Sequence, residues 1–402
     1  MTVTYFVSVS ISLFAGVLPA QILGVLWENV CESLRVEIPY IALLRLLGGA
    51  GAVAAVILSD RIRGYILARD LIVGAIALEA MSLIGFSLSR EFWNLGVWIT
   101  ALGFSLGLCL SLICYLLRET CSGKAGLLFA CSAMGVAAGS CLVGYILSMG
   151  RSWRTASQAL AILQIILCMS VFLLRRTLLR DVASILKQRR KEEDVLRQRR
   201  REKLIREKGN VDDRQQEAWL VRLLFLYGSA LCCGLLLLCA VHLTFSAQVS
   251  QGDQGADLVM CILTVCCGMA AGRVVTGLLK RSARGLWVIG TVVTLAVLIP
   301  CTLAARSGFT GGLVPLLGGA GTGFGAGMIF PNLIQTEDER LDGEAQTAMA
   351  GLIPAFYLGA DVLITPLVQS MSGVAGMAKS CLAMLALAVC MGICLAAARV
   401  RS

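Results

Sequence analysis

Charge is scarce in this chain. Only 15% of its 402 residues are charged, whereas 57% are hydrophobic, and the mean hydropathy is +0.81. A soluble domain of this size carries roughly 25% charged residues, with which it covers its surface in water. The surface of so apolar a chain needs lipid around it, so the composition excludes a soluble globular protein and indicates a membrane protein.

The residues of common catalytic and metal sites are also missing or scattered. The chain has one histidine, and its 17 cysteines form no CxxC pair, so neither a zinc site nor a disulfide framework is expected. No catalytic triad or carboxylate pair is apparent, and we predict neither an enzyme nor a bound cofactor or metal. The glycine run from Gly319 to Gly327 has no strand before it, so it predicts close helix packing or gating rather than a nucleotide-binding loop.

What the chain has in abundance is long apolar stretches. A helix needs about 20 apolar residues to cross the hydrocarbon layer of a membrane, and twelve stretches qualify. We therefore predict an all-α membrane protein with twelve transmembrane helices. The expected spans are 4–27, 38–59, 64–87, 92–117, 125–149, 153–176, 219–245, 256–279, 285–305, 309–334, 346–371 and 375–398.

A strongly basic segment divides these spans six and six. It runs from about Arg175 to Glu217 and holds 15 Lys/Arg and 9 Asp/Glu, a net charge of +6 out of +10 for the chain. We predict an N-terminal bundle over 1–176, a linker over 177–217 and a C-terminal bundle over 218–402. Within the linker, 181–208 reads as a charged helix. It either lies on the anionic inner leaflet or serves as a solvated tether.

Loop charges set the orientation. The short loops after spans 2, 4 and 8 are basic, whereas those after spans 1 and 7 are acidic. By the positive-inside rule, the linker and both termini face the cytoplasm. We expect a multi-pass protein of the plasma membrane, and the basic charge argues for this orientation rather than for nucleic-acid binding.

Two basic turns at equivalent places in the two halves suggest an internal repeat. The motifs of these turns and of the spans are Asp60-Arg61, Gly272-Arg273, Gly277, Gly135–Gly139, Trp153-Arg154, Phe330-Pro331-Asn332 and Tyr357-Leu358-Gly359-Ala360. Together with the twelve-span layout, these motifs resemble the major facilitator superfamily, and the region from 318 to 373 is similar to its fucose-permease-like sugar branch. Val56 and Arg281 depart from the family's turn pattern.

The resemblance implies two pseudo-symmetric six-helix bundles that transport a small solute by alternating access, as a monomer. No ATP-binding motif is present, so an ion or substrate gradient would supply the energy, and we expect the ion to be a proton carried by Asp361 or Glu79. A drug or metabolite exporter of the same fold remains an alternative, as does a non-transporting membrane sensor or scaffold.

Charges inside spans are the main functional candidates, because each is costly in lipid. Spans 2 and 11 face each other in the resembled fold, so Arg45 and Asp361 either form an outer lock or cap separate polar sites. Glu79, near the middle of span 3, is either a structural partner or a proton site. Asp60, Arg61 and Arg118 are expected at an inner latch near the start of span 11.

The remaining gating candidate is Arg273, in the basic turn of the second half. In the resembled fold, spans 1, 4, 7 and 10 line the cavity, and their polar residues provide the expected contacts to substrate. The cavity thus lacks a fixed charge, which favours a neutral polar metabolite such as a sugar, or an amphipathic compound, over a strongly anionic substrate. The expected cavity residues are Gln21, Ser105, Tyr227, Ser229, Thr322 and Asn332.

Overall fold

The computed structural model describes residues 3–37, 40–63, 66, 68–120, 125–174, 213–250, 258–279, 283–307, 313–334, 352–360 and 374–400. Within these ranges every regular element is a helix, and nine helices are long and apolar enough to cross a membrane. Most of the basic linker, including the predicted helix over 181–208, lies outside the described residues, and so does Asp361.

The helices follow the predicted spans closely, apart from the first span. Two of them are named here by their span, the span-6 helix (Trp153–Leu174) and the span-11 helix (352–360). Helix α8 begins at Asp213, inside the segment predicted as linker. The others are α1 (Val3–Ala15), α2 (Ile22–Leu34), α3 (Ile41–Arg63), α4 (Ala68–Leu88), α5 (Phe92–Thr120), α6 (Ala125–Ser148), α8 (Asp213–Ser250), α9 (Leu258–Leu278), α10 (Ala283–Arg306), α11 (Leu313–Ile334) and α13 (Val374–Val400).

The first span is broken, whereas a single helix over 4–27 was expected. Residues 16–21 form turns between α1 and α2. Pro19 explains the break, because it has no N–H to donate to the carbonyl of Ala15 and its ring crowds that carbonyl. Tighter bonds replace the helical ones, with the N–H of Leu18 donating to Ala15 O at 3.1 Å and that of Ile22 to Pro19 O at 3.0 Å.

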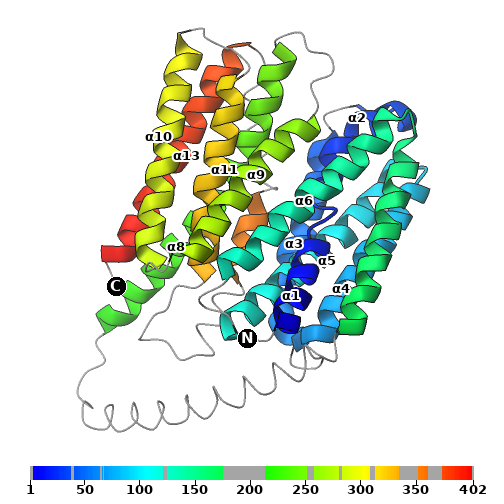
Figure 1. Cartoon of the computed structure of the whole chain (residues 1–402), viewed down its shortest axis with the longest axis horizontal. Helices are drawn as coiled ribbons and strands as arrows, with labels where there is room; N and C mark the ends of the chain where they lie inside the picture. Colours follow the sequence, from blue (N-terminus) through cyan, green and yellow to red (C-terminus); the bar gives the residue numbers. More distant parts are fainter. Residues whose placement is uncertain are drawn as a thin grey trace.

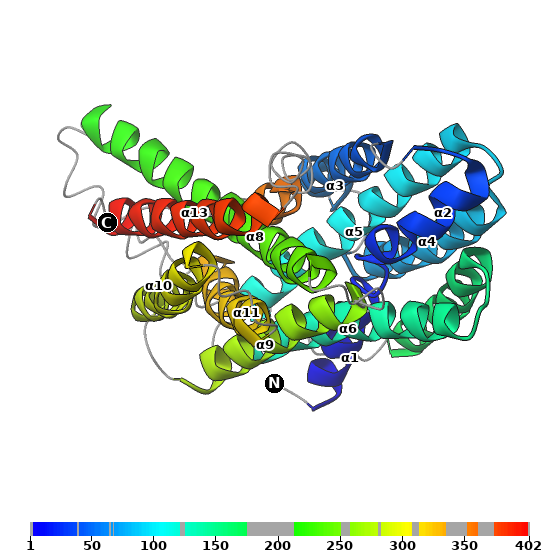
Figure 2. The same cartoon turned by 90° about the horizontal axis from the view of Figure 1, so that it is seen from above.

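The helices form two bundles that lie side by side (Figures 1 and 2). In the first, α5 packs against α3 and α4, while α6 packs against α1 and α2. In the second, α11 packs against α8, α9 and α10, and α13 against α8 and α10. The bundles meet mainly along α6 and α9, with smaller contacts of α6 with α11 and of α2 with α9.

Small residues bring α6 and α9 together at both ends. A Cβ atom on Gly126 would lie 2.7 Å from the carbonyl oxygen of Arg273 and 2.8 Å from the amide nitrogen of Gly277. At the other end, a Cβ on Gly144 would lie 2.5 Å from a methyl of Val259. Glycine permits this approach because it has no side chain, so the two bundles are in close contact near both ends of α6 and α9.

The glycine run of α11 serves helix packing. A Cβ on Gly323 would meet the backbone of Val265 in α9, and one on Gly327 would lie 2.5 Å from the carbonyl oxygen of Met269. On the other face of α11, a Cβ on Gly321 would lie 2.6 Å from Val297 of α10. The packing role that the sequence predicts for this run is confirmed.

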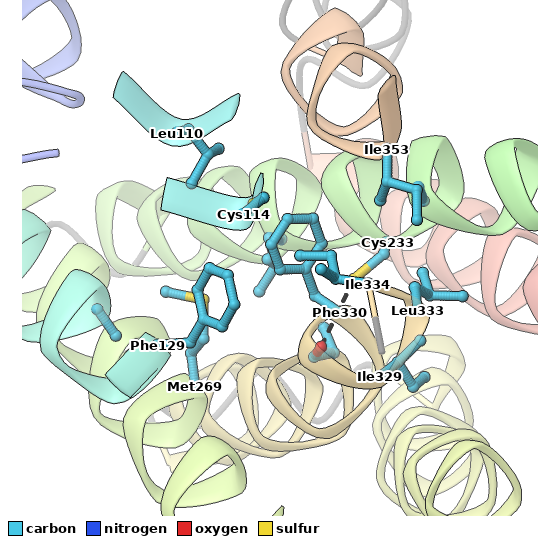
Figure 3. Packing of buried hydrophobic residues seen from close by; sticks show 14 of the residues in the cluster. Leu110, Cys114, Phe129, Cys233, Met269, Ile329, Phe330, Leu333, Ile334 and Ile353 are labelled. Carbon is cyan, nitrogen blue, oxygen red and sulfur yellow. Dashed lines mark hydrogen bonds between the residues drawn. The ribbon is translucent and has the colours of Figure 1, made fainter. Parts of the chain in front are cut away.

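A buried apolar cluster joins the two bundles near the end where α5 and α11 end and α6 begins (Figure 3). Leu110, Cys114 and Phe129 come from the first bundle and meet Cys233, Met269 and Phe330 of the second. The rings of Phe129 and Phe330 pack edge to face at 5.6 Å between centroids. This cluster closes the space between the bundles at the end predicted to face the cytoplasm.

Candidate functional site

A cavity of about 1020 Å³ lies between the two bundles, part of it open to solvent. Its walls come from the α1–α2 turn, α5, α6, α8, α9, α11 and the span-11 helix, so both bundles contribute. Most of the lining side chains are aliphatic, such as Val17, Leu110 and Ile262. Against this apolar background, the polar groups of the lining are Gln21, Ser132, Arg273, Tyr357 and the thiol of Cys266.

Arg273 is the charged residue of this lining. It lies on α9 with only 3% of its surface exposed. Its Nη1 donates hydrogen bonds to the carbonyl oxygen of Phe129 at 2.8 Å and to the hydroxyl of Ser132 at 2.6 Å, both on α6. The guanidinium carbon also lies 5.8 Å from the Phe129 ring centroid. The expectation of a cavity without a fixed charge is therefore wrong.

Aromatic rings form the floor of the cavity. Phe129 of α6, Phe330 of α11 and Tyr357 of the span-11 helix all belong to the lining. The rings of Phe330 and Tyr357 lie 4.5 Å apart between centroids, so Phe330 links the other two. The Phe129–Phe330 contact crosses the boundary between the bundles, whereas Phe330 and Tyr357 belong to the same bundle.

A second hollow of about 600 Å³ adjoins the cavity and holds Arg45. The two share Ala20, Gln21, Leu106 and Leu358 in their linings. A Cβ on Gly24 would lie 3.6 Å from Oε1 of Gln21 and 3.7 Å from Nη2 of Arg45, so both polar groups lie over this glycine. The predicted partner Asp361 lies outside the described residues, and the Arg45–Asp361 lock stays a prediction.

Glu79 is the buried carboxylate of the first bundle, at 0% exposure on α4. Its Oε2 accepts a hydrogen bond from Nε2 of Gln164 on the span-6 helix. The same nitrogen donates to the carbonyl of Ala15 at 3.0 Å, the carbonyl that Pro19 leaves without its helical partner. Oε1 of Glu79 has no hydrogen-bond partner within the described ranges.

The surroundings of Glu79 are uncharged in the described part of the chain. The thiols of Cys109 on α5 and Cys168 on the span-6 helix lie close enough to interact with it electrostatically. The Cys109 side chain also contacts Gly16, at the start of the α1–α2 turn. Glu79 is thus connected through Gln164 to the broken first span, although it does not line the cavity.

Of the six polar residues expected in the cavity, Gln21 is the one that the structure places in its lining. The hydroxyls of Ser105, Ser229 and Thr322 are buried and donate to carbonyls of their own helices, at 2.7–2.8 Å. The amide of Asn332 donates in the same way to Met328 O at 2.5 Å. Tyr227 stacks on Phe356, with 4.5 Å between ring centroids and 7° between ring planes.

The predicted inner latch is only partly visible. Arg61 lies exposed near the end of α3. The side chains of Asp60 and Arg118 are outside what the structure describes, although their backbones lie in α3 and α5. Arg273, expected in a basic turn, lies instead within α9 and faces the cavity.

Sequence reasoning overlooked Ser132, Gln164 and Tyr357. A signal was present for Gln164, because a polar residue in the middle of an apolar span needs a buried partner, and Glu79 is a second such residue in the same bundle. No comparable signal marked Ser132, since a serine within a helix usually bonds to a carbonyl of its own helix. Its hydroxyl does so here, donating to Phe129 O at 2.8 Å while accepting from Arg273.

The family model described as Major Facilitator Superfamily matches residues 2–365. No curated protein sequence matches the chain. Among solved structures, the fold is similar to that of the MFS proton:xylose symporter XylE bound to 6-bromo-6-deoxy-D-glucose. The TM-score is 0.71 at 13% sequence identity, over 98% of this chain and 95% of that chain, a likeness of fold alone.

Proposed function

Because this chain belongs to the Major Facilitator Superfamily, and is therefore a multi-pass membrane transporter rather than an enzyme, we propose that it carries a small amphipathic solute by alternating access. The observation that carries this proposal is the cavity between the bundles, with its largely aliphatic walls and few polar groups. Pockets of this kind bind ligands through apolar area, and a few polar contacts orient them.

The lining favours an amphipathic solute over a sugar. A sugar presents hydroxyls on every side, and burying them without hydrogen bonds is costly. Ser132 and Arg273 already bond to each other here, and the rings of Phe129, Phe330 and Tyr357 pack against one another. Few groups therefore remain for a polyol, whereas the aliphatic walls suit a molecule with one polar end.

The contacts between the bundles suggest how the cavity changes sides. Opening the closed end requires Phe129 and Phe330 to separate, since they belong to different bundles. We propose that α6 and α9 stay together during this motion, because glycine contacts hold them at both ends, at Gly126 and at Gly144. The bundles then rock about this line, as in other two-bundle transporters.

Ion pairs at the two ends are proposed to set the balance between the two orientations. Arg45 would pair with Asp361 at the outer end, and Asp60 with Arg61 and Arg118 at the inner latch. Exchanging the charges, Arg45→Asp with Asp361→Arg, should restore transport that either single change abolishes. Failure of the exchanged pair to transport, while still inserted and folded, would rule out the outer lock.

Proton coupling is assigned to Glu79. A carboxylate buried among uncharged groups is costly in its ionised form, so we propose that Glu79 binds a proton at Oε1, the oxygen without a partner in the described structure. Loss of that proton would strengthen the hydrogen bond that Gln164 donates to Glu79. The same amide nitrogen donates to the carbonyl of Ala15, where the first span breaks. The proton would thus bias the position of the α1–α2 turn, whose residues line the cavity.

The membrane arrangement completes the proposal. We propose a monomer of the plasma membrane in which both termini and the 177–217 linker are cytoplasmic, between bundles over 1–176 and 218–402. The excess of Lys/Arg in the linker supports this orientation. Attraction to anionic lipid would hold the linker near the inner leaflet.

Reconstitution into proteoliposomes tests the function. We expect saturable, protonophore-sensitive uptake of at least one labelled compound from a panel of amphipathic carboxylates, amides and amines, and none in empty liposomes. Uptake of xylose or glucose but of no amphipathic probe would overturn the substrate class. Binding of a probe without flux would instead indicate a sensor or scaffold.

A further inference from the structure

We infer that Arg273 is a binding site for an anionic group, and that the solute is a monoanionic amphiphile of the carboxylate type. This inference rests on the proposed function and deepens it, since it identifies which polar end the cavity selects. It reverses the expectation from sequence that the cavity disfavours anions.

The burial and the hydrogen-bond partners of the Arg273 guanidinium support this inference. Arg273 is 97% buried and touches the cavity, yet its acceptors are one backbone carbonyl and one hydroxyl. Both bonds use Nη1, and Nε has no hydrogen-bond partner among the described residues. No carboxylate among the described residues pairs with it. Neutral acceptors alone leave a full positive charge uncompensated in an apolar site.

The arrangement of the N–H groups of the guanidinium also supports it. A guanidinium presents parallel N–H groups that match the two oxygens of a carboxylate. Nη1 is engaged by Phe129 and Ser132 on α6, whereas Nε has no hydrogen-bond partner among the described residues and can donate to a ligand. A neutral donor would be enough for bonds to a carbonyl and a hydroxyl, so the bonds to α6 alone do not explain a charged side chain.

The charge and the walls of the cavity around Arg273 indicate the charge and shape of the ligand. Among the described residues of the cavity lining, Arg273 is the charged one, so one negative charge on the ligand balances it. A dianion such as a phosphate monoester would leave one charge uncompensated. Beyond Arg273, the walls are aliphatic, with Val265 and Met269 on α9, Leu237 on α8 and Val17 at the α1–α2 turn. These walls suit the apolar body of the molecule.

Arg273 would also link binding to movement. Its present hydrogen bonds hold α9 of one bundle to α6 of the other. An anion that draws the guanidinium toward itself competes with those bonds at the boundary between the bundles. The solute is then sensed at the α6–α9 contact about which the two bundles are proposed to rock.

The test measures thermal unfolding of the full chain in lipid nanodiscs, titrated with octanoate, octanamide and octyl phosphate. A ligand that binds the folded state raises the unfolding midpoint in proportion to its affinity. We expect octanoate to bind at least about tenfold more tightly than octanamide, as charge-assisted hydrogen bonds generally do. Octyl phosphate, nearly a dianion at pH 7.5, should bind less tightly than octanoate.

Variants separate anion recognition from a structural role. In Arg273→Gln the preference for octanoate over octanamide should fall below about twofold, while Arg273→Lys should keep part of it. The exposed Arg90 offers the matched control, and Arg90→Gln should keep the whole preference. Simple loss of the bond to α6 lowers stability without changing the ratio between the two probes.

The outcomes are distinguishable from failure of the transport proposal. Equal binding of octanoate and octanamide to the wild-type chain overturns the inference even if Arg273→Gln does not fold. Tighter binding of octyl phosphate than of octanoate would also overturn it. Absence of flux for every probe, with the octanoate preference intact, would overturn transport and leave the anion site standing.

Discussion

Each bundle buries an ionisable side chain, and the two differ in where their partners lie. Glu79 of the first bundle bonds to Gln164 of the same bundle and is not part of the cavity lining. Arg273 of the second bundle bonds across the boundary to α6 and touches the cavity. Burial alone does not distinguish these residues, since both are less than 5% exposed.

The location of these partners indicates which residue responds to the solute and which responds to the proton. The hydrogen bonds of Arg273 join the two bundles at the α6–α9 contact about which they are proposed to rock, and the same side chain lines the cavity. The surroundings of Glu79 stay within one bundle and change only through the α1–α2 turn, to which Gln164 is bonded. Arg273 is therefore suited to sense the solute and Glu79 to sense the proton. Four experiments test this difference between Arg273 and Glu79.

Charge reversal at Glu79 should have the largest effect. Glu79→Lys places an ammonium among uncharged groups, and an uncompensated buried charge costs about 3–5 kcal/mol. We expect most of the folded, monodisperse protein to be lost in size-exclusion chromatography. Glu79→Gln is the matched control and should behave like the wild type. A Glu79→Lys protein with a wild-type unfolding midpoint would mean that water reaches the site.

Arg273→Gln should act on transport more than on folding. Glutamine can still donate to Ser132, so the fold is retained, but the charge in the cavity is gone. Uptake of a labelled carboxylate into proteoliposomes should fall at least about tenfold, which corresponds to roughly 1.4 kcal/mol. Uptake of its neutral amide should change little. If uptake of the carboxylate and of the amide fell equally, Arg273 would serve only as a structural link between the bundles.

Glu79→Gln should remove pH dependence from transport. The wild-type chain needs a proton on Glu79, so its gradient-driven uptake should decline as the external pH rises through the range in which that carboxyl loses its proton. The variant cannot titrate there and should give a flat profile several-fold below the wild-type maximum. Asp70→Asn, in the first turn of the same helix, is the control and should keep the slope. If uptake by Glu79→Gln still depended on pH, Glu79 would not be the proton site, and Asp361 would be the next candidate.

The smallest effect concerns the link between Glu79 and the broken span. Gln164→Leu removes the donor to Glu79 and leaves the Ala15 carbonyl with the Leu18 N–H alone, at a cost of about 1–3 kcal/mol. Pro19→Ala supplies an N–H that can bond to Ala15, so the same change should then cost about 0.5–1 kcal/mol less. Denaturation midpoints of the four proteins of this double-mutant cycle give the coupling. Gln158→Leu, at an exposed position of the same helix, should show none.

Much of the fold was predictable, because hydropathy alone decides which segments cross a membrane. The twelve spans, the division into two bundles and the packing role of the α11 glycines follow from residue types and spacing. The break in the first span did not emerge from hydropathy, since Pro19 sits within an unbroken apolar run. A proline there removes one backbone donor, and this local effect outweighs the continuity of the hydrophobic pattern.

The site was predicted less well. Polar residues such as Ser105, Ser229 and Thr322 suggested a cavity surface, yet their hydroxyls are satisfied by carbonyls of their own helices. Such residues are compatible with any buried helix face. Arg273 was placed near a helix end by its distance from the basic turn, whereas its direction around α9 decides its role. Direction around a helix depends on the packing of α9 against α6, which sequence periodicity does not resolve when all faces are apolar.

The adjacent thiols of α9 have a practical consequence. Cys266 lines the cavity and is 5% exposed, whereas Cys267, the next residue, is on the exposed outer face of the helix. The chain thus carries a native pair of chemical reporters, one for the solute pathway and one for the lipid side. A polar, membrane-impermeant alkylating reagent applied from either side, followed by peptide mass spectrometry, should mark Cys266 only from the side to which the cavity is open. Cys267 should react with lipid-soluble reagents in every conformation.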